Sequence, residues 1–166
     1  EAHGALGLAL HADNQLDDAI RHLRRALNLG AVSADTHNLM GVALASQDRL
    51  DEATLQFRQA LEIDPNFLDA HANLAMAAQL QGNPDQAIQH YREVIRIGPT
   101  AAETHNELGL MLAATDELAE ATVHFRQALQ LDPNFAFAHA NLGTALELQG
   151  NANDALGHYQ QAVRLA

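Results

Sequence analysis

Histidine is the residue in this chain best suited to chemistry, and it recurs at a fixed spacing. Five histidines are separated from one another by 34 residues: His3, His37, His71, His105 and His139. Imidazole binds metal ions and exchanges protons near neutral pH. A structural zinc site needs four converging ligands, whereas one histidine per unit places the rings roughly 8–10 Å apart, at the spacing of packed helices. We therefore predict that these histidines are packing residues and that the chain binds no metal ion.

Catalytic chemistry finds no other support in the sequence. A second set of histidines recurs in four of these units, just before an aromatic residue in three of them, and we expect it on the outer face: His22, His90, His124 and His158. The chain has no cysteine, no glycine-rich phosphate loop and no HExxH motif. Its carboxylates are spread over helix starts and polar faces. We predict a protein without enzymatic activity and without a cofactor.

The remaining residues follow the same 34-residue period, so the chain is a repeat array. We number each unit so that the first set of histidines occupies position 4. Position 8 is small (Gly7, Gly41, Ala75, Gly109, Gly143), position 20 is always alanine (Ala19, Ala53, Ala87, Ala121, Ala155), and position 24 is large (Leu23, Phe57, Tyr91, Phe125, Tyr159). Small residues let two helices approach closely while large ones fill the space between them.

Each unit has the pattern of two amphipathic helices joined by a polar turn. Asp48, Gly82-Asn83 and Gly150-Asn151 break the first helix, and an Asp or Asn just beyond can cap the second. Pro65, Pro99 and Pro133 end the second helix, because a residue before proline disfavours the helical conformation. The predicted repeats cover residues 1–33, 34–67, 68–101, 102–135 and 136–166 of one array.

This code of small and large positions resembles the tetratricopeptide-repeat family over the whole chain. The resemblance implies an all-α, right-handed solenoid of five antiparallel helix hairpins, with the first helices lining a concave groove. Repeats three and five share HANL (71–74 and 139–142) and LQGN (80–83 and 148–151). In these segments they look like the repeat region of O-linked N-acetylglucosamine transferases, which carries asparagines at position 6 of its groove.

The resemblance also assigns groove residues. In the family, positions 2, 5, 9, 12 and 13 of the first helices point into the groove, which here gives an acidic side and an apolar floor. The lysines and arginines that bind a peptide carboxylate in some co-chaperones of this family are missing at these places. The predicted groove residues are Asp35, Asn38, Val42, Asp69, Asn73, Met76, Glu103, Asn106, Leu110 and Asn141.

The charge of the chain indicates what it binds. A net charge of −12 repels nucleic acid and anionic membranes and favours a basic or amphipathic peptide. No stretch approaches the roughly 20 apolar residues that span a bilayer, so we expect no membrane insertion. The sequence therefore predicts a protein–protein interaction scaffold with a protein or peptide ligand.

Two other functions remain open at this stage. The array is alternatively the substrate-recruiting arm of a bacterial glycosyltransferase related to O-linked N-acetylglucosamine transferase, or a self-assembling scaffold that associates through apolar residues at its C-terminal end, among them Leu156, Val163 and Leu165. The chain starts at Glu1 and stops where the fifth unit ends, so we expect a fragment of a longer protein. We expect a cytoplasmic location, although the lack of cysteine suits the periplasm equally.

Overall fold

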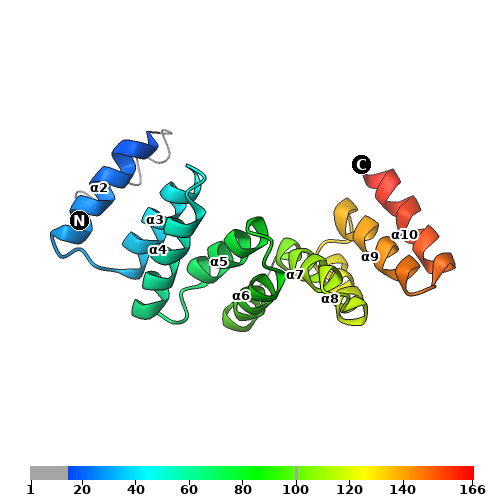
Figure 1. The fold of residues 1–166 in the computed structure, drawn as a ribbon. Helices are drawn as coiled ribbons and strands as arrows, with labels where there is room; N and C mark the ends of the chain where they lie inside the picture. The colour runs from blue at the N-terminus through cyan, green and yellow to red at the C-terminus, as the bar shows by residue number, and fades with distance from the viewer. Residues whose placement is uncertain (1–14, 100) are drawn as a thin grey trace. The chain divides into compact units, whose positions relative to one another are not determined.

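The computed structural model describes residues 15–99 and 101–166, and all regular structure in these ranges is helical (Figure 1). The first helix expected in repeat one, with His3 and Gly7, lies outside the described residues. The helices are α2 (Leu16–Asn28), α3 (Ala34–Ala45), α4 (Leu50–Ile63), α5 (Leu68–Leu80), α6 (Pro84–Ile97), α7 (Ala102–Ala114), α8 (Leu118–Leu131), α9 (Ala136–Leu148) and α10 (Ala152–Leu165). None of the helices in the described part of the chain has the length and apolar character that a membrane span requires.

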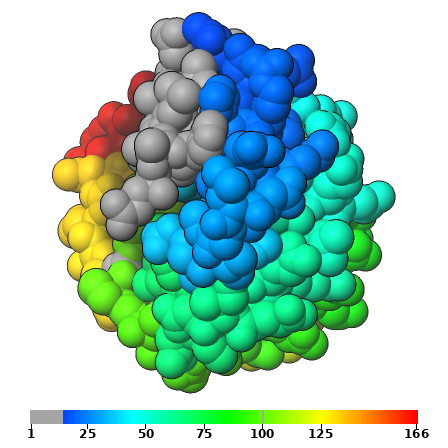
Figure 2. Space-filling model, turned by 90° about the vertical axis from the view of Figure 1, so that its left-hand side faces the viewer, coloured from blue at the N-terminus to red at the C-terminus, as the bar shows by residue number. Residues whose placement is uncertain are grey.

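The helices form two compact units, one extending to Gln81 and the other beginning at Gly82. In the N-terminal unit α3 packs on α2 and α4, and α5 packs on both α4 and α3. In Figure 2, which faces this unit, the blue atoms of α2 lie against the cyan atoms of the following hairpin. In the C-terminal unit α7 packs on α6 and α8, and α9 packs on α8, α10 and α7. Each unit is thus a stack in which consecutive helices touch, and the first helices of neighbouring repeats, α3 with α5 and α7 with α9, touch as well.

In the α3–α4, α7–α8 and α9–α10 hairpins the core is a close contact between a glycine and an aromatic ring. Phe57 and Phe125 are each 1% exposed, and Ala53 and Ala121 beside them on the same helices are fully buried. A Cβ atom added at Gly41 would lie 2.4 Å from Cε1 of Phe57. The small residues at position 8 and the large ones at position 24 therefore meet across the hairpin, as the sequence pattern predicts.

The turn after each of the first helices α3, α5, α7 and α9 contains one residue in the left-handed conformation. Asp48, Gly82, Asp116 and Gly150 occupy the same place in successive repeats, with φ between 61° and 81°. Glycine adopts this conformation without steric cost, and aspartate tolerates it better than most other residues. The alternation of aspartate and glycine follows the pairwise similarity of the repeats in the sequence.

The helix ends agree only in part with the capping expected from the sequence. Helices α4 and α8 end directly before Asp64 and Asp132, whose carboxylates accept a bond from the second following backbone N–H. Ser33 caps α3 by accepting a bond from the Thr36 amide at 3.1 Å. Asn151 precedes α10 without such a bond. Its φ of −92° and ψ of 54° differ from the extended backbone of Ser33, which directs the side chain to the helix amides.

Alanines make the contacts between consecutive repeats. Ala34, Ala60 and Ala70 form one buried cluster, with Phe67 packed against it. Ala102, Ala128 and Ala138 form the equivalent cluster in the C-terminal unit, covered by Phe135. The first turn of the following repeat, together with the phenylalanine before it, thus closes each alanine surface.

We expect Gly109→Ala to destabilise the protein although alanine is the better helix former. The added Cβ would lie 2.6 Å from Cε1 of the buried Phe125 ring, and overpacking of this kind costs about 1–3 kcal/mol. Gly157 on α10 has no atom within 4 Å of an added Cβ, so Gly157→Ala is the matched control and should stabilise by up to about 1 kcal/mol. Urea unfolding measures both changes, and a Gly109→Ala protein as stable as the Gly157→Ala protein would contradict the packing argument.

Candidate functional site

A pocket of about 270 Å³ opens in the N-terminal unit, between α3, α5 and the first half of α4. Three of the predicted groove residues, Val42, Asn73 and Met76, contribute to its wall. The other lining residues are Ala45, Ser46, Leu50, Phe57, Ala77 and Leu80. The structure therefore brings part of the predicted set together around a cavity large enough for one apolar side chain.

The wall of this pocket is apolar and accessible. Met76 is 57% exposed and Leu80 is 67% exposed, an unusual position for two large apolar side chains on one helix face. Val42 is half-buried on the opposite side, and Asn73 and Ser46 are the polar residues among those that line the pocket. A concave, mostly apolar surface with one amide at its edge suits the binding of an apolar group next to a hydrogen-bonding backbone.

Asn73 and Asn38 are joined to each other. The Asn73 side-chain amide donates to Oδ1 of Asn38 at 2.8 Å, and Asn38 is only 7% exposed. Asn38 therefore ties α3 to α5 instead of presenting its side chain on the surface. An amide group has two N–H donors and one carbonyl acceptor, so Asn73, which is half-buried, retains capacity for a ligand.

The same asparagine pair occurs in the C-terminal unit. Asn141 on α9 donates to Oδ1 of Asn106 on α7 at 2.8 Å, and Asn106 is 3% exposed. Leu110, which occupies the position of Val42 in its repeat, follows Asn106 by four residues on α7 and is half-buried. The spacing of these asparagines in the sequence is consistent with the contact. The two asparagines of each pair are 35 residues apart, one more than the repeat period.

The predicted acidic residues lie in the first turns of the first helices and are exposed: Asp35 on α3, Asp69 on α5 and Glu103 on α7. A carboxylate there interacts favourably with the positive end of the helix dipole. Asp35 and Val42 are seven residues apart and share one helix face, with a separation of roughly 10 Å along the axis. Asp69 and Met76 have the same relation on α5. The acidic groups of the N-terminal unit thus lie at one end of the face that carries the pocket.

Two histidines of the second set, His124 and His158, do not lie on the outer face, so the expectation was wrong for them. His124 of α8 lies with its Nδ1 3.0 Å from Nδ1 of His105 on α7, and the two rings stack with centroids 5.3 Å apart. His158 of α10 makes the same contact with His139 of α9 at 3.0 Å. The antiparallel hairpin brings the two positions together, because both lie at the same level of neighbouring helices.

The described histidines of the first set lie in contacts with neighbouring residues, and in two cases a ring nitrogen lies near a carbonyl oxygen. Nε2 of His71 lies 3.1 Å from the Pro65 carbonyl oxygen, and Nε2 of His139 lies 3.2 Å from that of Pro133. Burial lowers the pKa of His105, of His124 and of His158 below the ordinary histidine value. Within the described residues no three His, Asp or Glu side chains are grouped so as to hold a metal ion.

Comparisons with known proteins extend over most of the chain. Residues 4–67 and 44–108 match family models described as tetratricopeptide repeat, and residues 110–150 match one described as TPR repeat. No curated protein matches the sequence. The predicted all-α fold of repeated helix hairpins is confirmed by these matches together with the solved structures.

Several solved structures share this fold at low sequence identity. A crystal structure of MamA is 19% identical, with a TM-score of 0.90 over 96% of this chain and 93% of that one. A MamA RS-1 ArsTM double mutant is 20% identical, with a TM-score of 0.92 over 99% and 92% of the chains. YrrB, described as a TPR protein with an unusual peptide-binding site, is 22% identical, with a TM-score of 0.90 over 98% and 84%.

We expect Asn106→Ala to lower the free energy of unfolding by about 1–2 kcal/mol, because it removes a buried hydrogen bond and leaves the Asn141 amide without this acceptor. Asn141→Ala should cost less, since Asn141 is more exposed and water can replace it. Chemical unfolding followed by circular dichroism compares the two variants. A larger loss for Asn141→Ala would mean that the pair is not a structural contact of the kind described.

Proposed function

Because the chain belongs to the tetratricopeptide-repeat family, we propose that it is a protein-interaction scaffold whose N-terminal unit binds an extended peptide of a partner protein. The observation that carries this proposal is the open apolar pocket lined by Val42, Asn73 and Met76. A tetratricopeptide protein of similar fold, YrrB, is described as having a peptide-binding site, which supports a ligand of the same class.

The pocket determines the first feature of the peptide. Its volume of about 270 Å³ and apolar lining suit one aliphatic or aromatic side chain. Removing such a side chain and the exposed part of Met76 from water contributes about 1.5–3 kcal/mol to the free energy of binding. Asn73 at the edge can bind a peptide backbone amide without reading its sequence. The anchor residue therefore supplies affinity, and the backbone contact supplies orientation.

The acidic residues determine the second feature. Asp35 and Asp69 are exposed at the start of α3 and α5, and opposite charges on a ligand raise the association rate and fix its direction. The separation of roughly 10 Å along each helix corresponds to about three residues of an extended chain. The preferred peptide thus has a basic residue about three positions from its apolar anchor.

Recruitment of substrates for a glycosyltransferase would use the same surface. That function depends on asparagines at position 6 of the repeats, which here are Asn73 and Asn141. Both are half-buried and hydrogen-bonded to a neighbouring asparagine. Leu39 and Glu107 stand at the corresponding place in repeats two and four. A continuous row of asparagines is therefore interrupted, and we favour recognition through the apolar anchor.

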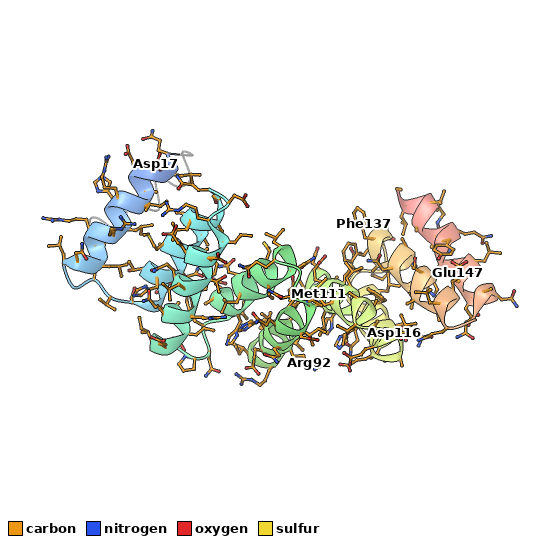
Figure 3. All side chains as sticks on the ribbon, in the orientation of Figure 1. Asp17, Arg92, Met111, Asp116, Phe137 and Glu147 are labelled. Atoms are coloured by element: carbon orange, nitrogen blue, oxygen red, sulfur yellow. The ribbon has the colours of Figure 1, made fainter. Side chains whose placement is uncertain are left out.

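Self-association is a second candidate, favoured by the face formed by α9 and α10. Phe137 is 73% exposed and Val163 is 80% exposed (Figure 3 labels Phe137 at the start of α9). Ala136 and Ala162 on this face stand 34 residues after Ala102 and Ala128, which α9 covers in the preceding repeat. This face contains a hollow of about 520 Å³, which is lined by Ala136, Phe137, Ala140, Ala162, Val163, Leu165 and Ala166. Its chemistry suits the apolar face of a helix from a second copy.

Substitution of Met76 tests peptide binding. Peptides are selected from a displayed library on the wild-type protein, and their affinities are measured by fluorescence anisotropy at low and high salt. We expect the selected peptides to carry an apolar residue near a basic one. Met76→Glu should weaken binding at least about tenfold, which corresponds to the loss of most of one buried side chain.

Leu55→Glu is the matched control for this test. Leu55 is 55% exposed on α4 of the same unit and does not line the pocket, so the same charge placed there should leave the affinity within about twofold, as expected for a long-range effect weakened by salt. Equal losses in both variants, or peptides without any apolar residue in common, would count against the pocket as the binding site.

Substitution of Phe137 tests self-association. The average molar mass of the wild type should rise with protein concentration in sedimentation equilibrium, because burying exposed apolar area drives association. Phe137→Glu should remove this concentration dependence and leave helicity unchanged. A wild-type protein that stays monomeric at high concentration would rule out the self-assembling scaffold, with no bearing on the peptide pocket.

A further inference from the structure

The two hairpins of the C-terminal unit that carry histidine pairs share one kind of hydrogen bond. In α7–α8 the bond joins the Nδ1 atoms of His105 and His124, and in α9–α10 it joins those of His139 and His158, each at 3.0 Å. A bond between two such nitrogens needs a proton on one of them and a bare lone pair on the other. The contact is thus lost when both Nδ1 atoms carry a proton.

The protonation of the α9–α10 pair follows from its neighbours. Nε2 of His139 lies 3.2 Å from the Pro133 carbonyl oxygen, which can only accept, so this Nε2 carries a proton. Nδ1 of neutral His139 is therefore bare and accepts the bond from Nδ1–H of His158. The remaining Nε2 of His158 is the position that takes the first additional proton in acid.

The α3–α4 hairpin has a different residue at the same place. Nδ1 of His37 lies 2.9 Å from Oε1 of Gln56, which occupies the position of His124 and His158 in the later repeats. An amide oxygen can only accept, so His37 donates. A charged imidazole still carries a proton on Nδ1, and acid leaves this bond intact.

We propose that the histidine pairs make α7–α8 and α9–α10 acid-labile, whereas the histidine–glutamine pair keeps α3–α4 closed over the same pH range. A first proton leaves the bond in place but brings charge into a partly buried contact. A second proton sets two N–H groups and two positive charges against each other at 3.0 Å. The hairpins then separate at the level of the rings, and the helix surfaces behind them become accessible.

Some charged groups near the histidine pairs favour the charged form of an imidazole and others oppose it. Burial, which opposes it, is the largest influence on the pKa of His105, His124 and His158. For His124, the Glu120 carboxylate 3.7 Å from its Nε2 favours the charged form, while Arg92, bonded to that carboxylate at 2.8 Å, opposes it. For His158, His139 and Arg126 oppose the charge and Asp154 favours it. For His105, burial and then His124 oppose the charge.

The direction of the effect on stability follows from these pKa changes. The pKa of His105, of His124 and of His158 is lower in the folded protein than the ordinary value near 6.5. The unfolded chain therefore binds more protons than the folded one below that value. The stability of these contacts is fully present above the ordinary pKa and is lost as the pH falls through the lowered one.

A double variant, His124→Gln with His158→Gln, tests the proposal. It gives both hairpins the histidine–glutamine pair that α3–α4 already has. Melting temperatures are measured by circular dichroism at about pH 8 and about pH 5.5, on either side of the ordinary histidine pKa. We expect the fall in melting temperature of the wild type to exceed that of the variant by roughly 4–8 °C.

The reverse substitution, Gln56→His, adds a third histidine pair and should make the fall larger than in the wild type. It also decides the matter alone if the double variant does not fold at the higher pH. Equal falls in the wild type, the double variant and the Gln56→His protein would overturn the proposal.

Discussion

The contact between a glycine on the first helix and an aromatic ring on the second is the constraint from which the other features follow. At Gly41, Gly109 and Gly143 an added Cβ would lie within 3.0 Å of the facing ring, so the two helices of these hairpins are held at a distance that only a missing side chain permits. This separation brings positions 4 and 23 of neighbouring helices within hydrogen-bonding distance, where the histidine pairs form. The core packing and the polar contacts therefore have one geometric cause.

Polar side chains then fix the relation between successive first helices. The bonds from Asn73 to Asn38 and from Asn141 to Asn106 join α3 to α5 and α7 to α9, each within one unit. Asn38 and Asn106 are only 3–7% exposed, so water has little access to their side-chain oxygens and these bonds satisfy them. Part of the surface that the family pattern assigns to ligand binding is thus used to align the helices, and the binding surface that we propose rests mainly on Val42, Met76 and the acidic residues.

The fold was predictable from the sequence because small and large residues recur at fixed positions of a 34-residue period. Such a pattern is what close packing of paired helices requires. The turns were equally readable, since Asp48 and Gly82 are residue types that accept a left-handed backbone. The burial of individual polar side chains was not predictable from the sequence. Position 5 and position 23 both look solvent-facing on one helix alone, and only the neighbouring helix shows that Asn106 and His124 point into a contact. The pocket itself depends on side-chain volumes at four or five places that no repeat rule specifies.

Variation on one backbone explains how such an array could distinguish ligands. Met76 in the N-terminal unit corresponds to Thr144 in the C-terminal unit, and Val42 corresponds to the larger Leu110. The first unit has an exposed apolar wall, whereas the α9–α10 hairpin of the second carries polar side chains: the Tyr159 hydroxyl donates to Glu147 at 2.7 Å. A phenylalanine at the place of Tyr159 would lack that group, as Phe57 and Phe125 do. Because the helix positions are set by the small-residue contacts, these exchanges alter the surface without disturbing the core, and recognition can differ between the two units while the fold stays the same.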